Sequence, residues 1–428
     1  MNVALPFSVS LDLATAATAR SDFEAALTQS EKALEWLKSA HADKSLELLR
    51  VPDRRDDVEQ ARAAADKWGT NTSDVAVLGI GGSSLGGQAL AELIPFGSQR
   101  SARVIFFDNA DPFTFEAALS SFDLRSTRFI AISKSGGTAE TLSQTLAAAA
   151  AIEAAGGGKY LAQHFIAVTE PKGSALKSFA DSIGCPVLAH PLGVGGRYSV
   201  LTMVGVLPAL LLGLDVIAMR EGAASVVDQL LSANSAADVP ACTGAALHHA
   251  QAAAGKLTET VLWSYSDRLK TFGPWWRQLW AESLGKNGMG TTPVAALGPV
   301  DQHSQLQLFL DGPGNALHTV VTTDTQNKGP CIPSERAQML GLSYLSGKHI
   351  GDLIAAEARA TAETLARRGR PVRRIHVPKI DERALGALFM HFMLETIVMG
   401  RLMGVDPFDQ PAVEEGKVLA RRYLGASP

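Results

Sequence analysis

The sequence predicts an α/β protein with two units, each a doubly wound parallel sheet covered by helices on both faces, and with helical segments at the two ends. Short apolar runs alternate with helical stretches at residues 75–78, 104–107, 129–132, 165–168 and 186–189. A second series follows at residues 260–264, 294–297, 318–322 and 374–377. Strands that alternate with helices at this spacing indicate a parallel sheet. The chain has 428 residues, 46% of them apolar, which suffices for two or three domains with sizeable cores.

The expected organisation has four segments. They are an N-terminal helical segment (residues 1–65), a first α/β domain (66–224), a second α/β domain (225–383) and a C-terminal helical tail (384–428). The first segment is charged and rich in alanine, and its leucines recur at helical spacing until a break near Pro52.

Composition excludes several classes of protein. The formal net charge of -4 gives no general field that would attract nucleic acid. The three cysteines, Cys185, Cys242 and Cys331, are far apart, which suits a reducing cytoplasm better than a disulfide framework or a zinc site. The N-terminus has no basic stretch before an apolar run, so we expect no signal peptide. The uncharged stretch at residues 200–214 is too short for a membrane span, contains Pro208 and favours a buried helix.

The segment SKSGGT, residues 133–138, has the features of an anion-binding loop. It follows the apolar run at residues 129–132 and precedes a helical stretch that extends to Ala155. Free amides and the dipole of a helix N-terminus favour negative charge. Three hydroxyl side chains can donate to phosphate oxygens, and two glycines let the backbone come close. An ordinary strand–helix turn with a good N-cap is the alternative.

The glycine-rich segment GIGGSSLGG, residues 79–87, allows several interpretations. The dinucleotide fingerprint lacks its third glycine because Ser84 stands there, although Asp108 could bind a ribose. The P-loop pattern fails because Gly87 replaces its lysine. Residues 82–86 match the nucleophile elbow of α/β-hydrolases, G-x-S-x-G. That hypothesis leaves the second hydroxyl-rich loop at Ser133 unexplained, whereas the adjacent glycines also suit close approach to a sugar phosphate.

Charged residues in three further segments could carry chemistry. Arg197 lies in the glycine-flanked segment GGRYS, residues 195–199. Gln278 and Glu282 are four residues apart in WWRQLWAESLGKN and therefore share one face of the predicted helix. His303 lies in DQHSQ, residues 301–305. Taken alone, each could be an ordinary surface or structural residue.

Together with DPFDQPAVEEGK at residues 406–417, these segments resemble, in the same order, the motifs of the glucose-6-phosphate isomerase family, which has the sugar-isomerase (SIS) fold. The resemblance covers roughly residues 75–420. It implies two SIS-type, flavodoxin-like subdomains and an aldose–ketose isomerase that acts on a hexose 6-phosphate without a cofactor. It also implies a homodimer with shared active sites, in which the motif histidine reaches across from the partner subunit.

The resemblance assigns a role to each catalytic candidate. Glu282 would be the base that moves a proton between C2 and C1 of a cis-enediol intermediate. Arg197 would stabilise the negative charge that develops on the enediol oxygens. His303 and Lys417 would open the sugar ring. The implied substrate contacts are Gly82, Ser83, Ser133, Lys134, Ser135, Thr138 and Gln278.

The chain departs from the family pattern in two places. Ser135-Gly136-Gly137 stands where many members have bulkier residues, which affects the number of phosphate donors but spares Ser133 and Thr138. Asp301 stands where many members have glycine, which affects loop geometry but spares His303.

The expected function is the reversible isomerisation of glucose 6-phosphate and fructose 6-phosphate. An enzyme that also isomerises mannose 6-phosphate, a non-catalytic SIS-type sugar-phosphate sensor and a nicotinamide-dependent oxidoreductase remain as alternatives. Metal-dependent isomerisation is disfavoured. His248 and His249 would point about 100° apart on a helix, and no third ligand accompanies His391 and Glu395. We expect no membrane or nucleic-acid partner.

Overall fold

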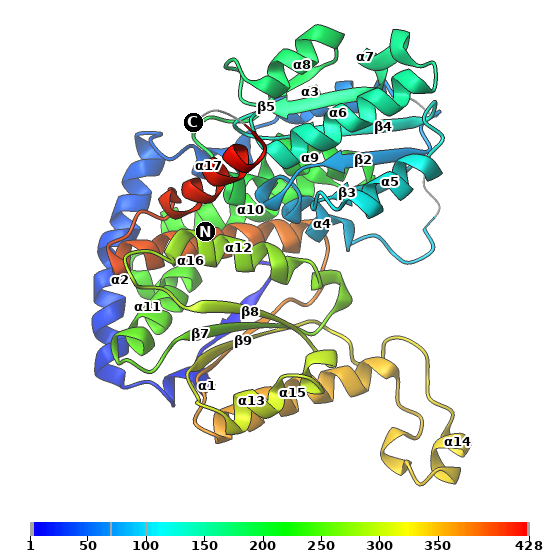
Figure 1. Cartoon of the computed structure of the whole chain (residues 1–428). Coiled ribbons are helices and arrows are strands. Elements are labelled where there is room, and N and C mark those ends of the chain that lie inside the picture. Colours follow the sequence, from blue (N-terminus) through cyan, green and yellow to red (C-terminus); the bar gives the residue numbers. More distant parts are fainter. Residues whose placement is uncertain (1–3, 69–70, 99–101, 426–428) are drawn as a thin grey trace.

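The computed structural model describes residues 4–68, 71–98 and 102–425 and contains two five-stranded sheets with a layer of helices between them (Figure 1). The parallel sheets covered by helices confirm the predicted α/β class. Every strand predicted from the apolar runs is present, with ends that shift by up to two residues.

The first sheet has the order β3-β2-β4-β5-β6, and all its neighbouring strands are parallel. Its strands are β2 (Asp74–Leu78), β3 (Arg103–Phe107), β4 (Thr127–Ile132), β5 (Phe165–Thr169) and β6 (Val187–Ala189). In chain order this is 2-1-3-4-5, the doubly wound arrangement of flavodoxin-like folds. The strand order reverses between β2 and β4, so the loops that follow these two strands lie at the topological switch point, where such sheets bind ligands.

The second sheet has the order β1-β10-β9-β7-β8. Its strands are β7 (Glu259–Ser264), β8 (Thr292–Leu297), β9 (Ala316–Thr322), β10 (Val372–His376) and, at the edge, β1 (Ser8–Ser10). β1 pairs antiparallel with β10, whereas the other pairs are parallel. The four strands predicted for this sheet are therefore parallel, and β1, which was not predicted, adds an antiparallel edge from the N-terminal segment.

The described residues contain seventeen α-helices, most of which pack against the two sheets or between them. They are α1 (Asp12–Thr15), α2 (Arg20–Ala42), α3 (Asp56–Asp66), α4 (Leu85–Ala91), α5 (Pro112–Ser121), α6 (Ala139–Ala154), α7 (Leu161–His164), α8 (Ala175–Ile183), α9 (Met203–Leu211), α10 (Val216–Ser232), α11 (Pro240–Ala253), α12 (Phe272–Leu284), α13 (Leu306–Asp311), α14 (Ser334–Met339), α15 (Ile350–Arg367), α16 (Glu382–Met403) and α17 (Glu414–Tyr423).

Alternate residues of each buried strand enter different cores. In β2, Ala76 and Leu78 join the core under α5, α6 and α8, whereas Val75 and Val77 join the core shared with α3 and α9. This follows from the period of two in a strand, and it explains why the strand is an unbroken apolar run. The core shared with α3 and α9 extends through the helices of the middle layer to the second sheet. The two sheets are therefore joined by one continuous hydrophobic core.

Helix α16 is the centre of the middle layer. It contacts α10, α11 and α12, and its 22 residues are long and apolar enough to cross a membrane. Because 89% of its most apolar stretch is buried inside the fold, α16 is a core helix of this protein and not a membrane span. The stretch near Pro208 likewise forms the buried helix α9, as predicted.

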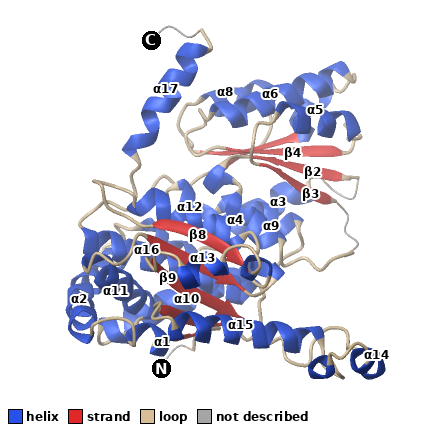
Figure 2. Cartoon of the chain, turned by 60° about the horizontal axis from the view of Figure 1, so that its bottom comes forward, coloured by secondary structure: helices blue, strands red, loops and turns tan. Residues whose placement is uncertain are grey.

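Two segments project from the body. Residues 323–349, which include α14, extend away from the second sheet (Figure 1) and expose the side chains of Met339, Leu340 and Tyr344. Helix α17 contains no buried residue and stands off from the rest of the chain (Figure 2).

Candidate active site

The two loops singled out from sequence are neighbours at the switch point of the first sheet. Residues 79–87 follow β2, residues 133–138 follow β4, and Leu78 pairs with Ala131 at the ends of these strands. The parallel pairing brings both loops to the same edge of the sheet. A ligand could therefore contact both loops at once.

The hydroxyl-rich loop has the geometry of an anion cradle. The Ser133 and Thr138 hydroxyl groups are 2.9 Å apart and hydrogen-bond to each other. Thr138 occupies the N-cap of α6, but its side-chain oxygen accepts no hydrogen bond from a first-turn amide, so these amides remain available to a ligand. Ser135 and Gly137 are exposed. Gly136 has a φ of 62°, and a Cβ there would lie 2.0 Å from Ser174 Oγ, which accounts for glycine where bulkier residues are usual.

The glycine-rich loop packs directly against two other segments of the site. A Cβ on Gly82 would lie 2.2 Å from the carbonyl group of Gly196, so only glycine lets the two loops touch. A Cβ on Gly81 would lie 2.8 Å from Gln278 Nε2. Ser83 ends the short 3-10 turn Gly81–Ser83 and is half-buried. The glycines therefore bring the backbone of this loop against Arg197 and helix α12.

The structure of the glycine-rich loop gives little support to a hydrolase nucleophile elbow or to a dinucleotide site. Ser84, the nucleophile of a hydrolase elbow, is buried and accepts a hydrogen bond from Gln88 Nε2 at 2.9 Å. Asp108, the candidate for a ribose contact, accepts from the same amide at 2.6 Å. Both groups are engaged in a local network that joins α4 to β3.

Arg197, Gln278 and Glu282 form the chemical centre of the site. Arg197 Nη1 lies 3.0 Å from Glu282 Oε1, and the Gln278 amide donates to Glu282 Oε2 at 3.0 Å. The Arg197 side chain is only 3% exposed, whereas the Glu282 side chain is 27% exposed and can meet a substrate. A carboxylate held at both oxygens beside an open loop can accept and return a proton in a fixed orientation.

Helix α12 produces this arrangement through its two different faces. Trp275, Trp276, Leu279 and Trp280 are buried and fix the helix in the core, while Gln278 and Glu282 lie on the face toward the glycine-rich loop. The helix ends at Leu284, two residues after Glu282, and Gly285 is its C-cap.

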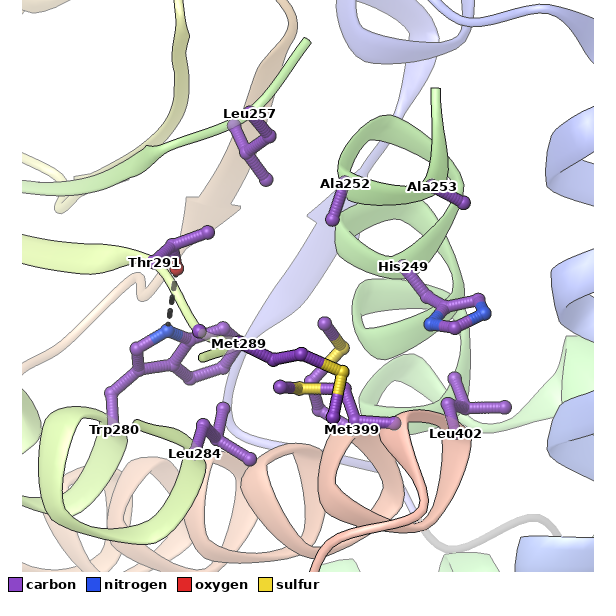
Figure 3. Close-up of a pocket in the computed structure, with 12 residues that line it drawn as sticks. His249, Ala252, Ala253, Leu257, Trp280, Leu284, Met289, Thr291, Met399 and Leu402 are labelled. Carbon is purple, nitrogen blue, oxygen red and sulfur yellow. Dashed lines mark hydrogen bonds between the residues drawn. The ribbon is translucent and has the colours of Figure 1, made fainter. Parts of the chain in front are cut away.

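The opposite face of α12 lines a separate cavity of about 310 Å³ (Figure 3). Trp280 and Leu284 point into it, together with Met289, Met399 and Leu402. The indole of Trp280 donates to Thr291 Oγ1 at 2.9 Å. Residues two apart on a helix face in nearly opposite directions, so this apolar cavity lies away from the Glu282 carboxylate.

His303 lies at the end of the short turn Val300–Gln302 and is exposed. Asp301 accepts from the Leu297 amide at 2.7 Å and from the Ser304 hydroxyl at 2.6 Å, which fixes the turn. Partial burial would raise the pKa of Asp301, but hydrogen bonds from Ser304, Gln305 and the Leu297 amide outweigh burial and lower this pKa. Within the part of the chain that the structure describes, no hydrogen bond or ion pair joins His303 to Arg197 or Glu282.

The two candidate lysines lie in different surroundings. Lys417 lies on exposed α17 and pairs with Glu414 at 2.7 Å, so the structure does not bring it to Glu282. Lys134 donates to the Leu192 carbonyl at 3.1 Å and lies 3.9 Å from Glu170. Partial burial lowers the pKa of Lys134 from its ordinary value, and Glu170 opposes that effect.

The buried histidines that could suggest a metal site, His248 and His391, lie near a buried ion pair. Arg373 Nη1 pairs with Glu395 Oε2 at 2.7 Å, and His391 Nε2 lies 3.2 Å from the same oxygen. Both ring nitrogens of His248 have partners, the Gly244 carbonyl and the Thr260 hydroxyl. Across residues 4–68, 71–98 and 102–425, no group of three His, Cys, Asp or Glu residues is arranged to hold a metal ion.

Comparison with known proteins decides the family. The model of the family described as phosphoglucose isomerase matches residues 37–321 and 340–426. The chain belongs to the phosphoglucose isomerase family. A glucose-6-phosphate isomerase of Rubrobacter xylanophilus is 37% identical over 385 residues, which cover 88% of each chain. A glucose-6-phosphate isomerase of Thermus thermophilus is 36% identical over 88% of this chain and 89% of its own.

Two solved structures have a fold similar to that of this chain. A Thermus thermophilus protein described as hypothetical superposes with a TM-score of 0.87 at 33% identity, over 98% of this chain and all of its own. A glucose-6-phosphate isomerase from Chlamydia trachomatis superposes with a TM-score of 0.81 at 22% identity, over 98% of this chain and 88% of its own.

Sequence reasoning missed three side chains at this candidate site. Gln410 accepts from Arg197 Nη1 at 2.9 Å, Ser283 accepts from Arg197 Nε at 2.8 Å, and Lys286 lies 2.6 Å from Asp409. All three belong to segments that resemble family motifs. The available signal was their place in those segments, because nothing in the residues themselves shows that residues 406–410 fold back against Arg197 and Lys286.

The phosphate loop gives a first prediction. Replacing Ser133 and Thr138 together by alanine should weaken binding of inorganic phosphate by a few kcal/mol, at about 1–2 kcal/mol for each lost charge-assisted hydrogen bond. Titration calorimetry measures the effect. Ser143→Ala, an exposed serine on α6 that donates only to the Glu140 carbonyl, is the matched control. Unchanged affinity in the double variant would assign the anion site to another loop.

Proposed function

We propose that the chain interconverts glucose 6-phosphate and fructose 6-phosphate through a cis-enediol intermediate, as a glycolytic and gluconeogenic enzyme that needs no metal. Membership of the phosphoglucose isomerase family supports the substrate and the reaction. The observation that carries the proposal is the Glu282 carboxylate, held by Arg197 and Gln278 beside the glycine-rich loop.

Glu282 is the proton carrier of the proposed mechanism. Its carboxylate removes the proton from C2 of the open sugar and returns it to C1 on the same face, so one base serves both carbons. Negative charge then develops on the enediol oxygens. The buried guanidinium of Arg197 stabilises this charge without reorganising, since it is already held by hydrogen bonds.

The phosphate group of the substrate takes no part in the chemistry and holds the sugar in place. Ser133, Ser135, Thr138 and the amides of the first turn of α6 bind it, with Lys134 beside them. The backbone of Gly82 and the side chains of Ser83 and Gln278 contact the sugar. Remote binding energy is thereby used to orient C1 and C2 against Glu282.

Ring opening is assigned to His303 and Lys417, and it requires a second subunit. We propose a two-fold homodimer in which His303 of one chain serves Glu282 of the other. Two observations support this arrangement. His303 is exposed and has no polar contact with Glu282 of its own chain within the described residues. The projecting segment 323–349 exposes large apolar side chains, as an unpaired interface does.

The free cysteine thiols of the chain support a cytoplasmic location. All three cysteines are free, and two of them are buried. Burial raises the pKa of Cys185 to about 11 and the pKa of Cys242 to about 12, so both thiols stay protonated and unreactive.

The proposed activity is tested by a coupled assay of the purified protein on fructose 6-phosphate, with and without EDTA. We expect glucose 6-phosphate to form at the same rate in both, because Glu282 and Arg197 supply the chemistry without a metal. Loss of activity with EDTA would indicate a metal-dependent isomerase. Binding of sugar phosphate without turnover would support a sensor, and turnover only with added nicotinamide cofactor would support an oxidoreductase.

A further inference from the structure

The connection between α16 and α17, residues 404–413, is held against the site by two cations. Arg197 Nη2 donates to the carbonyl oxygens of Pro407 at 2.6 Å and of Asp409 at 2.9 Å. Lys286 Nζ donates to the carbonyl oxygen of Asp406 and lies 2.6 Å from Asp409 Oδ1. Charge-assisted hydrogen bonds of this kind are about twice as strong as neutral ones.

Lys286 has no role in the proposed mechanism, yet its side chain is only 12% exposed. It follows the end of α12 by two residues, directly after Gly285. A largely buried ammonium group loses most of its hydration and needs compensating partners. Its partners all belong to residues 406–409, so the interaction is directed at this connection.

The position of the connection determines the surroundings of the base. Gln410 accepts from Arg197 Nη1, the same nitrogen that lies 3.0 Å from Glu282 Oε1. Any shift of residues 406–410 therefore changes the hydrogen bonds of the guanidinium that faces the carboxylate. The connection also determines where α17 begins, because α17 has no buried residue of its own to fix it.

We propose that Lys286 is a positioning residue for isomerisation. Its ammonium group fixes residues 406–410 against the segment that follows α12. It thereby holds Gln410 and Arg197 in register with Glu282 and fixes the start of α17, which carries Lys417. The catalytic part of this inference rests on the proposed function. Its physical basis is preorganisation, since a charge that must stabilise a transition state helps only when it is already in place.

The first test measures the connection itself and needs no activity. In Lys286→Met, which keeps most of the length of the side chain and removes its charge, amide hydrogen exchange at residues 406–425 should become at least about tenfold faster, while exchange in α16 stays unchanged. Lys286→Arg should restore protection because it keeps the cation. Lys270→Met, an exposed lysine just before α12, is the matched control and should exchange like the wild type.

The second test measures turnover. Lys286→Met should lower kcat on fructose 6-phosphate by about 10- to 100-fold, as expected for a misplacement of about 1 Å. The inhibition constant of inorganic phosphate should stay the same, because the loop at residues 133–138 is not in contact with Lys286. Lys286→Arg should recover most of kcat. A general loss of folding would instead lower the melting temperature and would affect phosphate binding as well.

Each outcome decides part of the inference. Unchanged hydrogen exchange in Lys286→Met would overturn the fixing of residues 406–410, and faster exchange with wild-type kcat would overturn the positioning role. If Lys286→Met does not fold, Asp409→Asn removes the carboxylate partner instead and is judged by the same two measurements. If the wild-type protein shows no isomerase activity, the proposed function fails, and hydrogen exchange still decides whether Lys286 holds the connection.

Discussion

Glu282→Gln should lower kcat on fructose 6-phosphate by at least about a thousandfold, with KM little changed. The amide keeps the shape of the side chain and its neighbours but cannot carry the proton between C2 and C1. The phosphate loop is untouched, so substrate affinity should persist. Steady-state kinetics measures the two constants. Exchange of the C2 proton with deuterated solvent, followed by NMR, should disappear in parallel, because it requires the same base.

The structure shows why this variant should still fold. Arg197 loses its charged partner but keeps its hydrogen bonds to Ser283, Pro407, Asp409 and Gln410. Glu153→Gln, an exposed glutamate on α6, is the matched control and should behave like the wild type. Wild-type kcat in Glu282→Gln, with an unchanged melting temperature, would show that another group is the base.

The strands could be predicted from sequence because each is a buried, apolar run. Residues 129–132, for example, lie in the middle of a parallel sheet and are covered on both faces, so nearly every position must be apolar. β1 could not be predicted in this way. Its sequence, Ser8-Val9-Ser10, is short and polar, and it is a strand only because β10 offers a free edge more than 360 residues later.

Contacts of the candidate site could be predicted from the residues alone only where both partners lie within one segment of the chain. The spacing of Gln278 and Glu282 is a local property of a helix, and their hydrogen bond at 3.0 Å follows from it. The contact between Arg197 and Glu282 depends on how the loop around Gly196 packs against Gly82 and α12, which no local pattern encodes. In the sequence analysis only the family resemblance brought these two residues together.

The folding of residues 406–410 against Arg197 and Lys286 could not be derived from their composition. Asp406, Pro407 and Asp409 contribute backbone carbonyl oxygens, and every residue has one, so the sequence gives no sign of which will bind a cation.

The phosphate loop, in contrast, could be predicted from its sequence. Its hydroxyl groups and glycines are needed at fixed places in one short turn, and the structure keeps Ser133 and Thr138 in contact.

A second large effect is expected when two inactive variants are combined in one dimer. Glu282→Gln and His303→Leu should each be nearly inactive, since each removes one step of the proposed mechanism. In a mixed dimer, a shared site puts both substitutions into one active site and leaves the other intact. If His303 acts across the two-fold axis, isolated mixed dimers should recover about half of the wild-type activity, provided that the two sites work independently.

The measurement requires co-expression with two different tags, sequential affinity purification, and sizing to confirm that the mixed dimer is intact. Dimers of a single variant, purified in the same way, set the background. If His303 serves Glu282 of its own chain, every site of the mixed dimer carries one substitution and activity stays near that background. An intact but inactive mixed dimer would thus rule out the shared site. The isomerase proposal would survive, because it depends on the Arg197–Glu282 pair at 3.0 Å within one chain.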